Sequence, residues 1–329
     1  MKNFKLPKSE FDFNNLTEDL YLVDEVAYNI TEIKDDKVSV KIVRDKDNCE
    51  VYTRITLDEF KSIVGYVEPS EPEDDGSGEI KHKMFDTIKI FLEFDNLPVY
   101  LYGPAGSGKN VLCKQLADEM GLPFYYTNCV LTKYDLVGYG DANGNYVPTA
   151  FFHAFTKGGV FMLDEFDASD ESAAITLNSA LANRYFDFPV IGNVEAHPDF
   201  KIIACGNTCG RGADEEYTGR NCLDAATLDR FSVIKIDYDE RVERRIANEG
   251  IVEFIHDLRQ SRDTANIKMI LGYRVIERLA KLESKFTTSS LVEMAVTKGM
   301  DKDEINILHQ NLQNKQNKFA KALKTLANL

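Results

Sequence analysis

The sequence predicts an α/β protein with a parallel sheet, preceded by a small β-rich module and followed by an all-helical region. Three observations predict this architecture. Short apolar runs alternate with helical stretches, as in parallel sheets covered on both faces; the runs are residues 99–102, 124–126, 160–163, 201–205 and 233–236. The strand pattern stops at about residue 239, and the rest of the chain has helical periodicity. Residues 67–79 combine acidic residues, Pro, Gly and Ser with no basic residue.

This acidic stretch cannot bury a hydrophobic face, so we interpret it as a solvated linker. A long surface loop within one domain is the alternative. Before it, residues 38–43 and 51–57 alternate apolar and polar side chains after turn-forming runs, which predicts β-hairpins, and residues 57–64 have a helical pattern. The expected parts are an N-terminal module at 1–66, the linker at 67–79, an α/β domain at 80–238, a helical domain at 239–300 and a C-terminal helix at 301–329.

The composition limits the partners that the chain can have. A formal net charge of −15 disfavours broad electrostatic binding to nucleic acid. The last helical run nevertheless carries lysines without any acid between them. A solvated helix face is the usual role of such residues, and a local nucleic-acid contact is the alternative; they are Lys315, Lys318, Lys321 and Lys324.

The expected cellular location follows from the absence of membrane-spanning and secretion signals in the sequence. No apolar stretch reaches the roughly 18 residues that a membrane span needs, and the charged N-terminus has no apolar core of a secretion signal. The six cysteines are scattered without a CxxC pair. Reduced thiols are therefore favoured over a zinc site at Cys205, Cys209 and Cys222. We expect a cytoplasmic protein with no membrane contact.

A phosphate-binding loop follows the strand predicted at 99–102. Gly-Pro-Ala-Gly-Ser-Gly-Lys-Asn, at 103–110, matches G-x-x-x-x-G-K and leads into a predicted helix at 111–120. Its glycines let backbone N–H groups face a phosphate, the helix N-terminus adds positive charge, and Lys109 adds a cation. No guanine-recognising motif is visible, so ATP is the expected nucleotide. The expected loop residues are Gly103, Pro104, Ala105, Gly106, Ser107, Gly108, Lys109, Asn110 and Val111.

Asn110 departs from the motif, which has Ser or Thr at this position as a Mg²⁺ ligand. An amide oxygen can also reach a metal ion, or a water molecule can fill the gap. The substitution therefore bears on metal affinity and turnover, while phosphate binding is unaffected.

Acidic residues follow the apolar strand predicted at 160–163. Asp164 and Glu165 would lie at the carboxyl edge of the sheet, where ligands of α/β proteins bind. Asp164 is the expected Mg²⁺ partner, and Glu165 the expected base that orients the attacking water. An acidic loop after an ordinary strand is the alternative. Asp167 and Asp170 are expected to cap a helix at 171–182.

Polar residues further along complete the candidate site. Asn207 follows the strand at 201–205 and can hold the attacking water, although a turn role is the alternative. Arg230 is expected to project into a neighbouring subunit as an arginine finger, with Arg211 and Arg220 as weaker candidates and a surface ion pair as the alternative. Arg274 begins a helical run and can fold back toward the γ-phosphate.

In the order of these motifs the chain resembles AAA+ ATPases of the MoxR and dynein-related group, in particular the small ATPase subunit of cobaltochelatase. The resemblance covers about residues 80–285, and its pieces are 103–110, 135–148, 158–169, 200–208, 217–231 and 272–274. It implies a P-loop core with a helical lid and a ring, usually of six subunits. It assigns Lys109 to Walker A, Asp164 and Glu165 to Walker B, Asn207 to sensor 1, Arg230 to the arginine finger and Arg274 to sensor 2.

The resemblance also implies two inserted hairpins that engage a client protein. One would turn at Asn143 and Gly144, and the other, within residues 188–200, around Gly192 and Asn193. Contact residues there would be Tyr134, Tyr139 and Tyr146, with core or turn packing as an equal alternative. The N-terminal module and the C-terminal helix have no counterpart in the resemblance.

Three functions follow from these motifs. The first is a Mg²⁺-dependent ATPase that remodels a client protein or complex, such as a chelatase-like assembly or a partner with a metal-ion-dependent adhesion site. The second, motivated by Asn110, is a nucleotide-gated assembly protein with little turnover. The third, a nucleic-acid-linked ATPase or GTPase, is disfavoured by the acidic composition.

Overall fold

The computed structural model describes five short strands before residue 57 and then residues 80–327, except 95, 214 and 215. Contacts within the chain divide it into two units, Met1–Gly78 and Glu79–Leu329. Each unit is described by itself. The helix predicted at 57–64 and the linker predicted at 67–79 lie outside the described residues.

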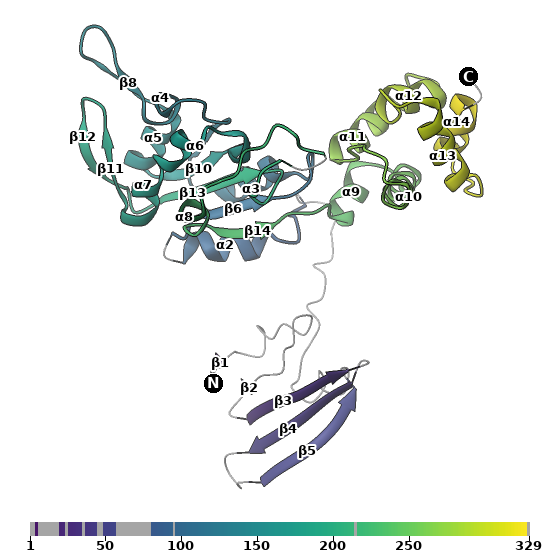
Figure 1. Cartoon of the computed structure of the whole chain (residues 1–329), viewed down its shortest axis with the longest axis horizontal. Helices are drawn as coiled ribbons and strands as arrows, with labels where there is room; N and C mark the ends of the chain where they lie inside the picture. The colour runs from purple at the N-terminus through teal and green to yellow at the C-terminus, as the bar shows by residue number, and fades with distance from the viewer. Residues whose placement is uncertain are drawn as a thin grey trace. The chain divides into compact units, whose positions relative to one another are not determined.

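The strands of the first unit form one sheet in the order β1-β2-β3-β4-β5. Figure 1 draws β3, β4 and β5 of this sheet as arrows. They are β1 (Phe4–Lys5), β2 (Leu20–Val23), β3 (Val26–Lys34), β4 (Lys37–Arg44) and β5 (Cys49–Thr56). β4 and β5 contain the two alternating segments of the sequence, and they pair antiparallel from Lys37 opposite Thr56 to Arg44 opposite Cys49. Alternation and turn-forming residues between such runs favour this kind of pairing.

A parallel five-stranded sheet forms the centre of the second unit, in the order β14-β6-β13-β10-β7. Its strands are β6 (Val99–Tyr102), β7 (Phe124–Thr127), β10 (Gly159–Leu163), β13 (Phe200–Gly206) and β14 (Ser232–Lys235). All five coincide with the predicted apolar runs to within one or two residues, and the predicted P-loop α/β core is confirmed. β6, β13 and β10 are neighbours, so the residues that follow these three strands meet at one edge of the sheet.

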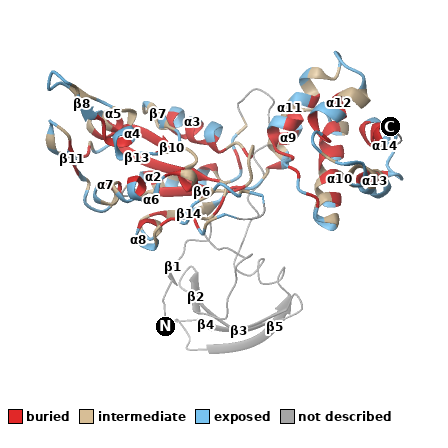
Figure 2. Cartoon of the chain, turned by 45° about the horizontal axis from the view of Figure 1, so that its top comes forward, coloured by how far each residue is buried: buried red, intermediate tan, exposed pale blue. Residues whose placement is uncertain are grey.

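Two hydrophobic clusters cover the sheet, and every residue of β10 and β13 is buried between them (Figure 2). One cluster joins Leu112 and Leu116 to Leu101. The other is rich in aromatic rings, with Phe155 packed 5.1 Å from Phe200 between ring centroids. The helices of this domain are α2 (Phe85–Glu93), α3 (Lys109–Glu119), α4 (Lys133–Val137), α5 (Ala150–Lys157), α6 (Glu171–Ile175), α7 (Asn178–Asn183) and α8 (Ala225–Leu228), with a 3₁₀ turn at η3 (Phe166–Ala168).

The first predicted hairpin is formed by β8 (Tyr139–Gly140) and β9 (Tyr146–Val147), between α4 and α5. Asp141 closes its turn, because its carboxylate accepts the backbone N–H groups of Asn143 at 2.8 Å and Asn145 at 2.7 Å. Gly144 has a φ of +81°, as the predicted turn requires.

The second hairpin turns earlier than predicted. β11 (Tyr185–Phe188) pairs with β12 (Gly192–Glu195), so the turn lies at 189–191, and Gly192 already pairs with Phe188. The predicted turn around Gly192 and Asn193 is wrong. Phe188 is buried in the aromatic cluster, which fixes the strand up to that residue, and Pro189 cannot continue the ladder because it has no N–H to donate.

The helix predicted at 171–182 is divided into α6 and α7. The N–H groups of Thr176 and Leu177 bond to carbonyls three residues back, which tightens the backbone between the two helices. Asp170 caps α6 as predicted, since its carboxylate accepts the N–H of Ser172 at 3.0 Å and of Ala173 at 3.3 Å. Asp167 caps no helix and has a different role, described below.

From residue 240 the regular secondary structure of the described chain is all helical, as predicted. The helices are α9 (Glu240–Ile246), α10 (Glu249–Ala265), α11 (Tyr273–Leu282), α12 (Thr288–Ala295), α13 (Lys302–Leu312) and α14 (Lys318–Ala327). Residues 302–327 thus form two helices in place of the single predicted one. α14 packs into the same core as α10, with Phe319 stacked 5.5 Å from Phe254 between ring centroids. Within the described part of the chain, no helix is long and apolar enough to span a membrane.

Candidate nucleotide-binding site

A pocket of about 490 Å³ opens at the carboxyl edge of the sheet. It is lined by the loop after β6, by the residues that follow β10 and β13, and by one face each of α9 and α11. Its charged and amide side chains come from residues far apart in the sequence. They include Lys109, Asn110, Asp164, Glu165, Asn207, Arg245 and Arg274.

The loop after β6 has the backbone geometry of a phosphate cradle. α3 begins at Lys109, directly after Gly108, whose φ is +85°. Gly103 is required for a different reason: a Cβ there would lie 1.8 Å from the carbonyl oxygen of Ile236. The loop therefore packs closely against the chain after β14 and presents the N-terminus of an 11-residue helix to the pocket.

Lys109 is only 7% exposed. Its Nζ donates to the carbonyl oxygens of Gly103 at 2.8 Å and Pro104 at 3.1 Å, and to Oδ1 of Asn207 at 3.3 Å. Burial lowers the pKa of the Lys109 ammonium, and nearby thiol and carboxylate groups oppose this only in part. The hydrogen-bond partners of the Lys109 ammonium given above are uncharged oxygens. A phosphate oxygen next to the ammonium would add a negatively charged partner.

Asn110 and Asp164 are in direct contact. Nδ2 of Asn110 donates to Oδ2 of Asp164 at 2.7 Å, and the other carboxylate oxygen accepts the N–H of Glu165 at 2.9 Å. Among the described residues, no group of three or more His, Cys, Asp and Glu side chains could hold a metal ion by itself. Magnesium usually takes one or two carboxylates and completes its shell with phosphate oxygens and water. These side chains therefore fit a Mg²⁺ ion that arrives with a nucleotide.

Glu165 lies in the left-handed region of the backbone, with a φ of +48°, and its side chain is 47% exposed. Its Oε2 is 3.6 Å from Nη1 of Arg220. The same nitrogen is 3.6 Å from Oδ1 of Asp167. Arg220 was predicted as a candidate finger for a neighbouring subunit, whereas its contacts here lie within its own subunit.

Asp167 is fully buried, which overturns its predicted role as a helix cap. Its Oδ2 accepts hydrogen bonds from the N–H groups of Asn207 and Thr208 at 2.9 and 2.8 Å, and from the Thr208 hydroxyl at 2.9 Å. These bonds tie the turn after β10 to the end of β13. They fix the backbone of Asn207, so that its side chain reaches both Lys109 and the pocket.

The two remaining predicted arginines are placed differently. Arg274, on the first turn of α11, lines the pocket, and the preceding N–H of Tyr273 donates to the carbonyl of Gly106 at 2.9 Å. The helical domain thus contacts the phosphate loop directly. Arg230 follows α8 and donates to the carbonyl of Ala226. Of the residues that the structure describes, Arg230 is not among those that line this pocket.

Two tyrosines that contact the phosphate loop were not predicted from the sequence. The hydroxyl of Tyr217 accepts the N–H of Ala105 at 2.9 Å, and the hydroxyl of Tyr238 donates to the Ala105 carbonyl at 3.2 Å. Neither tyrosine belongs to a phosphate-binding motif. An apolar wall is also present, suited to the flat face of a nucleotide base. It is formed by Ile80, Val111, Leu112, Val242 and Ile246.

The parallel sheet, the phosphate loop after β6 and the helical region after β14 define a P-loop fold of the AAA+ type. Residues 98–231 match the family model described as an AAA domain of the dynein-related subfamily. A Staphylococcus epidermidis protein, described as uncharacterized, is 27% identical over 231 residues, covering 61% of this chain and 85% of its own. An uncharacterized Staphylococcus aureus protein is 27% identical over 219 residues, covering 57% and 80%.

Among solved structures, NtrX from Brucella abortus is 17% identical with a TM-score of 0.42, over 73% of this chain and 52% of NtrX. The chain thus spans about half the length of that relative. NtrX in complex with ADP has a TM-score of 0.46 at 17% identity, over 83% of this chain and 70% of NtrX. A RuvB mutant from Thermotoga maritima has a TM-score of 0.39 at 16% identity, over 70% of this chain and 66% of its own.

Proposed function

We propose that this protein binds ATP, hydrolyses it in a Mg²⁺-dependent reaction and uses the cycle to remodel a client protein. One observation carries the proposal. Lys109, Asp164, Glu165, Asn207 and Arg274, from distant parts of the sequence, line a single pocket at the N-terminus of α3. A cation, two carboxylates, an amide and a second cation around a phosphate cradle are the groups that phosphoryl transfer requires.

In this proposal, the β- and γ-phosphates lie against the N–H groups at 106–110, and Lys109 leaves its carbonyl partners for the phosphate oxygens. A Mg²⁺ ion held by Asp164, with Asn110 beside it, would neutralise charge on those oxygens. Glu165 orients a water molecule in line with the γ-phosphate and accepts its proton. The bond from the γ-phosphorus to the bridging oxygen breaks, giving ADP and inorganic phosphate.

The base of the nucleotide would lie against the apolar wall, between α9 and the residues before α2. Val242 and Ile246 are one helical turn apart on α9 and line the pocket together with Ile80. His82 lines it as well, and its Nε2 donates to the carbonyl of Asp237 at 2.9 Å. Such a wall is suited to the flat apolar face of a base, and ATP is the proposed ligand because no guanine-recognising motif is visible in the sequence.

We further propose a ring of identical subunits, most simply six, similar to the MoxR-like group. Arg230 supports the ring, because it is not among the described residues that line its own subunit's pocket and would act at the nucleotide of a neighbour. The client would bind at the two hairpins. Tyr139 in the first hairpin is 50% exposed, and Tyr134, in α4 just before that hairpin, is 52% exposed. Tyr146 is better explained by packing: it donates to the Val137 carbonyl at 2.6 Å, and burial raises its pKa to about 12.

Turnover per subunit, measured across a range of protein concentrations, tests the proposal. Specific activity is expected to rise as subunits assemble. Glu165→Gln and Arg230→Ala are both expected to lose hydrolysis while retaining ATP binding, and mixing the two variants should restore part of it. Constant activity at all concentrations, with Arg230→Ala as active as the wild type, would contradict the ring.

A nucleotide-gated assembly protein with little turnover is the second candidate. The hydrogen bond between Asn110 and Asp164 favours it, because the amide donor competes with Mg²⁺ for the carboxylate that is its expected ligand. Here ATP would shift the assembly state without being consumed. Light scattering and phosphate release, measured on the same sample, distinguish the two candidates.

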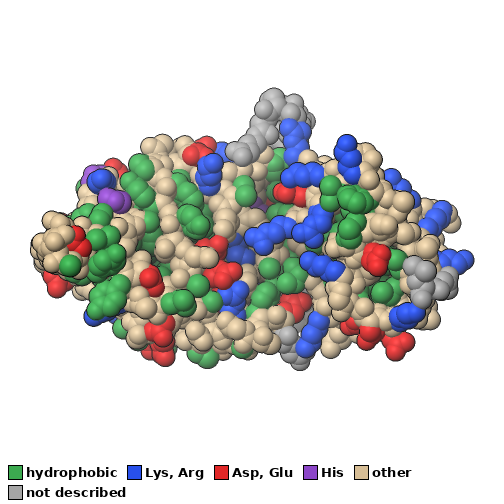
Figure 3. Space-filling model, turned by 90° about the horizontal axis from the view of Figure 1, so that it is seen from above, with side chains coloured by type: hydrophobic (Ala, Val, Ile, Leu, Met, Phe, Trp, Pro, Cys, Tyr) green, Lys and Arg blue, Asp and Glu red, His purple; other side chains and the backbone are tan. Residues whose placement is uncertain are grey.

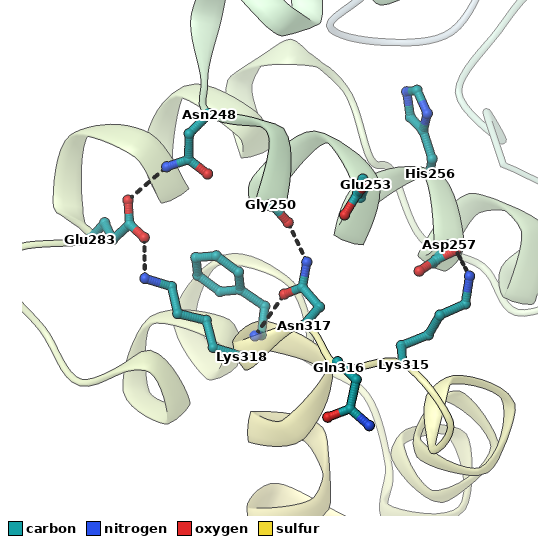
Figure 4. A pocket seen from close by; sticks show the side chains of 11 residues that line it. Asn248, Gly250, Glu253, His256, Asp257, Glu283, Lys315, Gln316, Asn317 and Lys318 are labelled. Carbon is teal, nitrogen blue, oxygen red and sulfur yellow. Dashed lines mark hydrogen bonds and ion pairs between the residues drawn. The ribbon is translucent and has the colours of Figure 1, made fainter.

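A nucleic-acid-linked function has less support. Lys315 pairs with Asp257 at 2.7 Å, and Lys318 pairs with Glu283, so half of the C-terminal lysine run is neutralised (Figure 4). The face in Figure 3 has a group of Lys and Arg side chains near its centre, with acidic and apolar side chains beside them. The formal net charge of −15 disfavours a nucleic-acid partner, whose phosphates require positive charge.

A further inference from the structure

Arg220 lies in the loop between β13 and α8, and its side chain is only 12% exposed. Its Nη1 lies 3.6 Å from Oε2 of Glu165 and 3.6 Å from Oδ1 of Asp167. One cationic nitrogen thus lies between the candidate base and a buried carboxylate. Neither acid is contacted in this way by Arg230, whose guanidinium donates to Ala226.

Asp167 is a fixed point on one side of this cation. Its Oδ2 accepts three hydrogen bonds from Asn207 and Thr208, while Oδ1 has no hydrogen-bond partner among the described residues. The carbonyl of Asp167 accepts the N–H of Asn221 at 2.7 Å, and Nδ2 of Asn221 donates to the Ser169 carbonyl at 2.9 Å. The residue next to Arg220 is therefore fastened to the same turn.

Glu165, on the other side, is a long side chain that is half exposed in an open pocket. Such a side chain has several accessible rotamers, and ordering one of them requires a partner. We propose that Arg220 is a positioning residue that orients the Glu165 carboxylate for hydrolysis, with Asp167 as its fixed anchor. This inference rests on the proposed ATPase function and adds to it a residue that acts in its own subunit.

Asp167 connects Asn207 and Glu165, the two residues that would contact the attacking water molecule. Asp167 fixes the backbone of Asn207 and, through Arg220, the side chain of Glu165. Loss of the Arg220 guanidinium would leave the hydrogen bond between Asp167 and Asn207 intact, but Glu165 would no longer be held. We therefore expect kcat to fall while the KM for ATP changes little, because the phosphate loop is not involved.

Arg220→Gln alone also leaves the buried charge of Asp167 without compensation, which destabilises the fold. The test therefore includes the double variant Asp167→Asn/Arg220→Gln. Asparagine keeps one oxygen for the three donors from Asn207 and Thr208, and it carries no charge that needs a cation. The double variant should regain the wild-type melting temperature and ATP affinity, whereas its kcat should stay about 10- to 100-fold low, as expected for a misplaced base.

A second readout does not depend on turnover. ADP with aluminium fluoride mimics the transition state of phosphoryl transfer. The double variant should bind this complex at least about tenfold more weakly than the wild type does, while its affinity for ATP should be unchanged. Arg220→Lys retains a cation beside both acids and should recover most of the kcat. Arg278→Gln, an exposed arginine on α11, controls for the loss of a positive charge.

Three results would overturn the inference. Wild-type kcat in the double variant would mean that Arg220 serves only to neutralise Asp167. A kcat above wild type in Arg220→Gln would mean that Arg220 restrains Glu165. If the double variant fails to fold, Arg220→Lys serves as the test. An Arg220→Lys protein that folds and binds ATP, but whose kcat is as low as that of Glu165→Gln, would also overturn the inference. Absence of hydrolysis in the wild type, with ATP bound, would instead refute the proposed ATPase function itself.

Discussion

The side-chain amide of Asn110 donates a hydrogen bond to the carboxylate of Asp164 across 2.7 Å. The two residues belong to different elements, the start of α3 and the residue after β10. Asn110 stands where the motif usually has a Ser or Thr hydroxyl. Its hydrogen bond connects the phosphate loop to the residue that follows β10. The amide donor of Asn110 therefore competes with a metal ion for the lone pairs of Asp164 Oδ2.

Asn110→Thr should therefore lower the Mg²⁺ concentration needed for half-maximal hydrolysis, by about tenfold if it resembles other changes around a metal site. A threonine hydroxyl supplies an oxygen ligand and removes the competing amide donor. Magnesium titrations of the ATPase rate measure this effect. Asn110→Ala is the control, because it removes the hydrogen bond without adding a ligand. An unchanged magnesium requirement in the Thr variant would mean that position 110 does not contact the ion.

Arg274→Ala should weaken ATP binding more than ADP binding. Arg274 lines the pocket from α11, whose first residue is bonded to the phosphate loop, so we expect its guanidinium to reach the terminal phosphate. Calorimetric titration of a hydrolysis-deficient Glu165→Gln background with either nucleotide gives the two affinities. Arg278→Ala, exposed on the same helix, is the matched control. An equal loss for ATP and ADP would indicate that Arg274 does not distinguish the γ-phosphate.

Gly206→Ala should destabilise the protein by about 3 kcal/mol, the upper part of the range for overpacking. A Cβ at Gly206 would lie 2.2 Å from the Tyr100 hydroxyl oxygen and 3.0 Å from Cγ of Asp167. Both neighbours are buried and hydrogen-bonded, so neither can move freely. Gly219→Ala, where no atom lies within 4 Å of the added Cβ, is the control and should change little. Urea unfolding with a slope common to both variants measures the difference.

His82 should make the stability of the protein depend on mildly acidic pH. Burial lowers the pKa of His82 below its ordinary value of 6.5, although its bond to the Asp237 carbonyl partly opposes the shift. The unfolded chain therefore binds the proton more readily than the folded chain. Stability contributed by neutral His82 is present above pH 6.5 and decreases as the pH falls from 6.5 through the folded pKa.

His82→Gln should flatten this acidic part of the stability profile. The amide of glutamine can still donate toward Asp237, but it cannot be protonated in this range. The free energy of unfolding, measured in urea from pH 7.5 to pH 5, would be compared for the two proteins. The same slope in both would assign the acid sensitivity to other groups.

The sequence by itself determined the phosphate loop and the strands that carry the pocket. Glycine positions, the lysine and the flanking apolar runs are local features, because backbone curvature and strand burial depend on neighbouring residues. Since carboxyl ends of parallel strands share an edge, Asp164 and Asn207 could be expected to meet. The lid was predicted for a similar reason, as its helical periodicity is local.

Only the tertiary structure decided how these residues are held. Asp167 follows the acidic strand and has the composition of a helix cap, yet it binds the backbone after β13, 40 residues later in the chain. Tyr217 and Arg220 contact the phosphate loop and Glu165 from a loop whose local sequence does not predict these contacts. The turn of the second hairpin lies at 189–191, after the buried Phe188, although Gly192 and Asn193 predicted it later in the chain. These contacts join segments that are far apart in the sequence. They depend on tertiary packing and on the pairing of buried charges, and neither can be predicted from one local stretch of sequence.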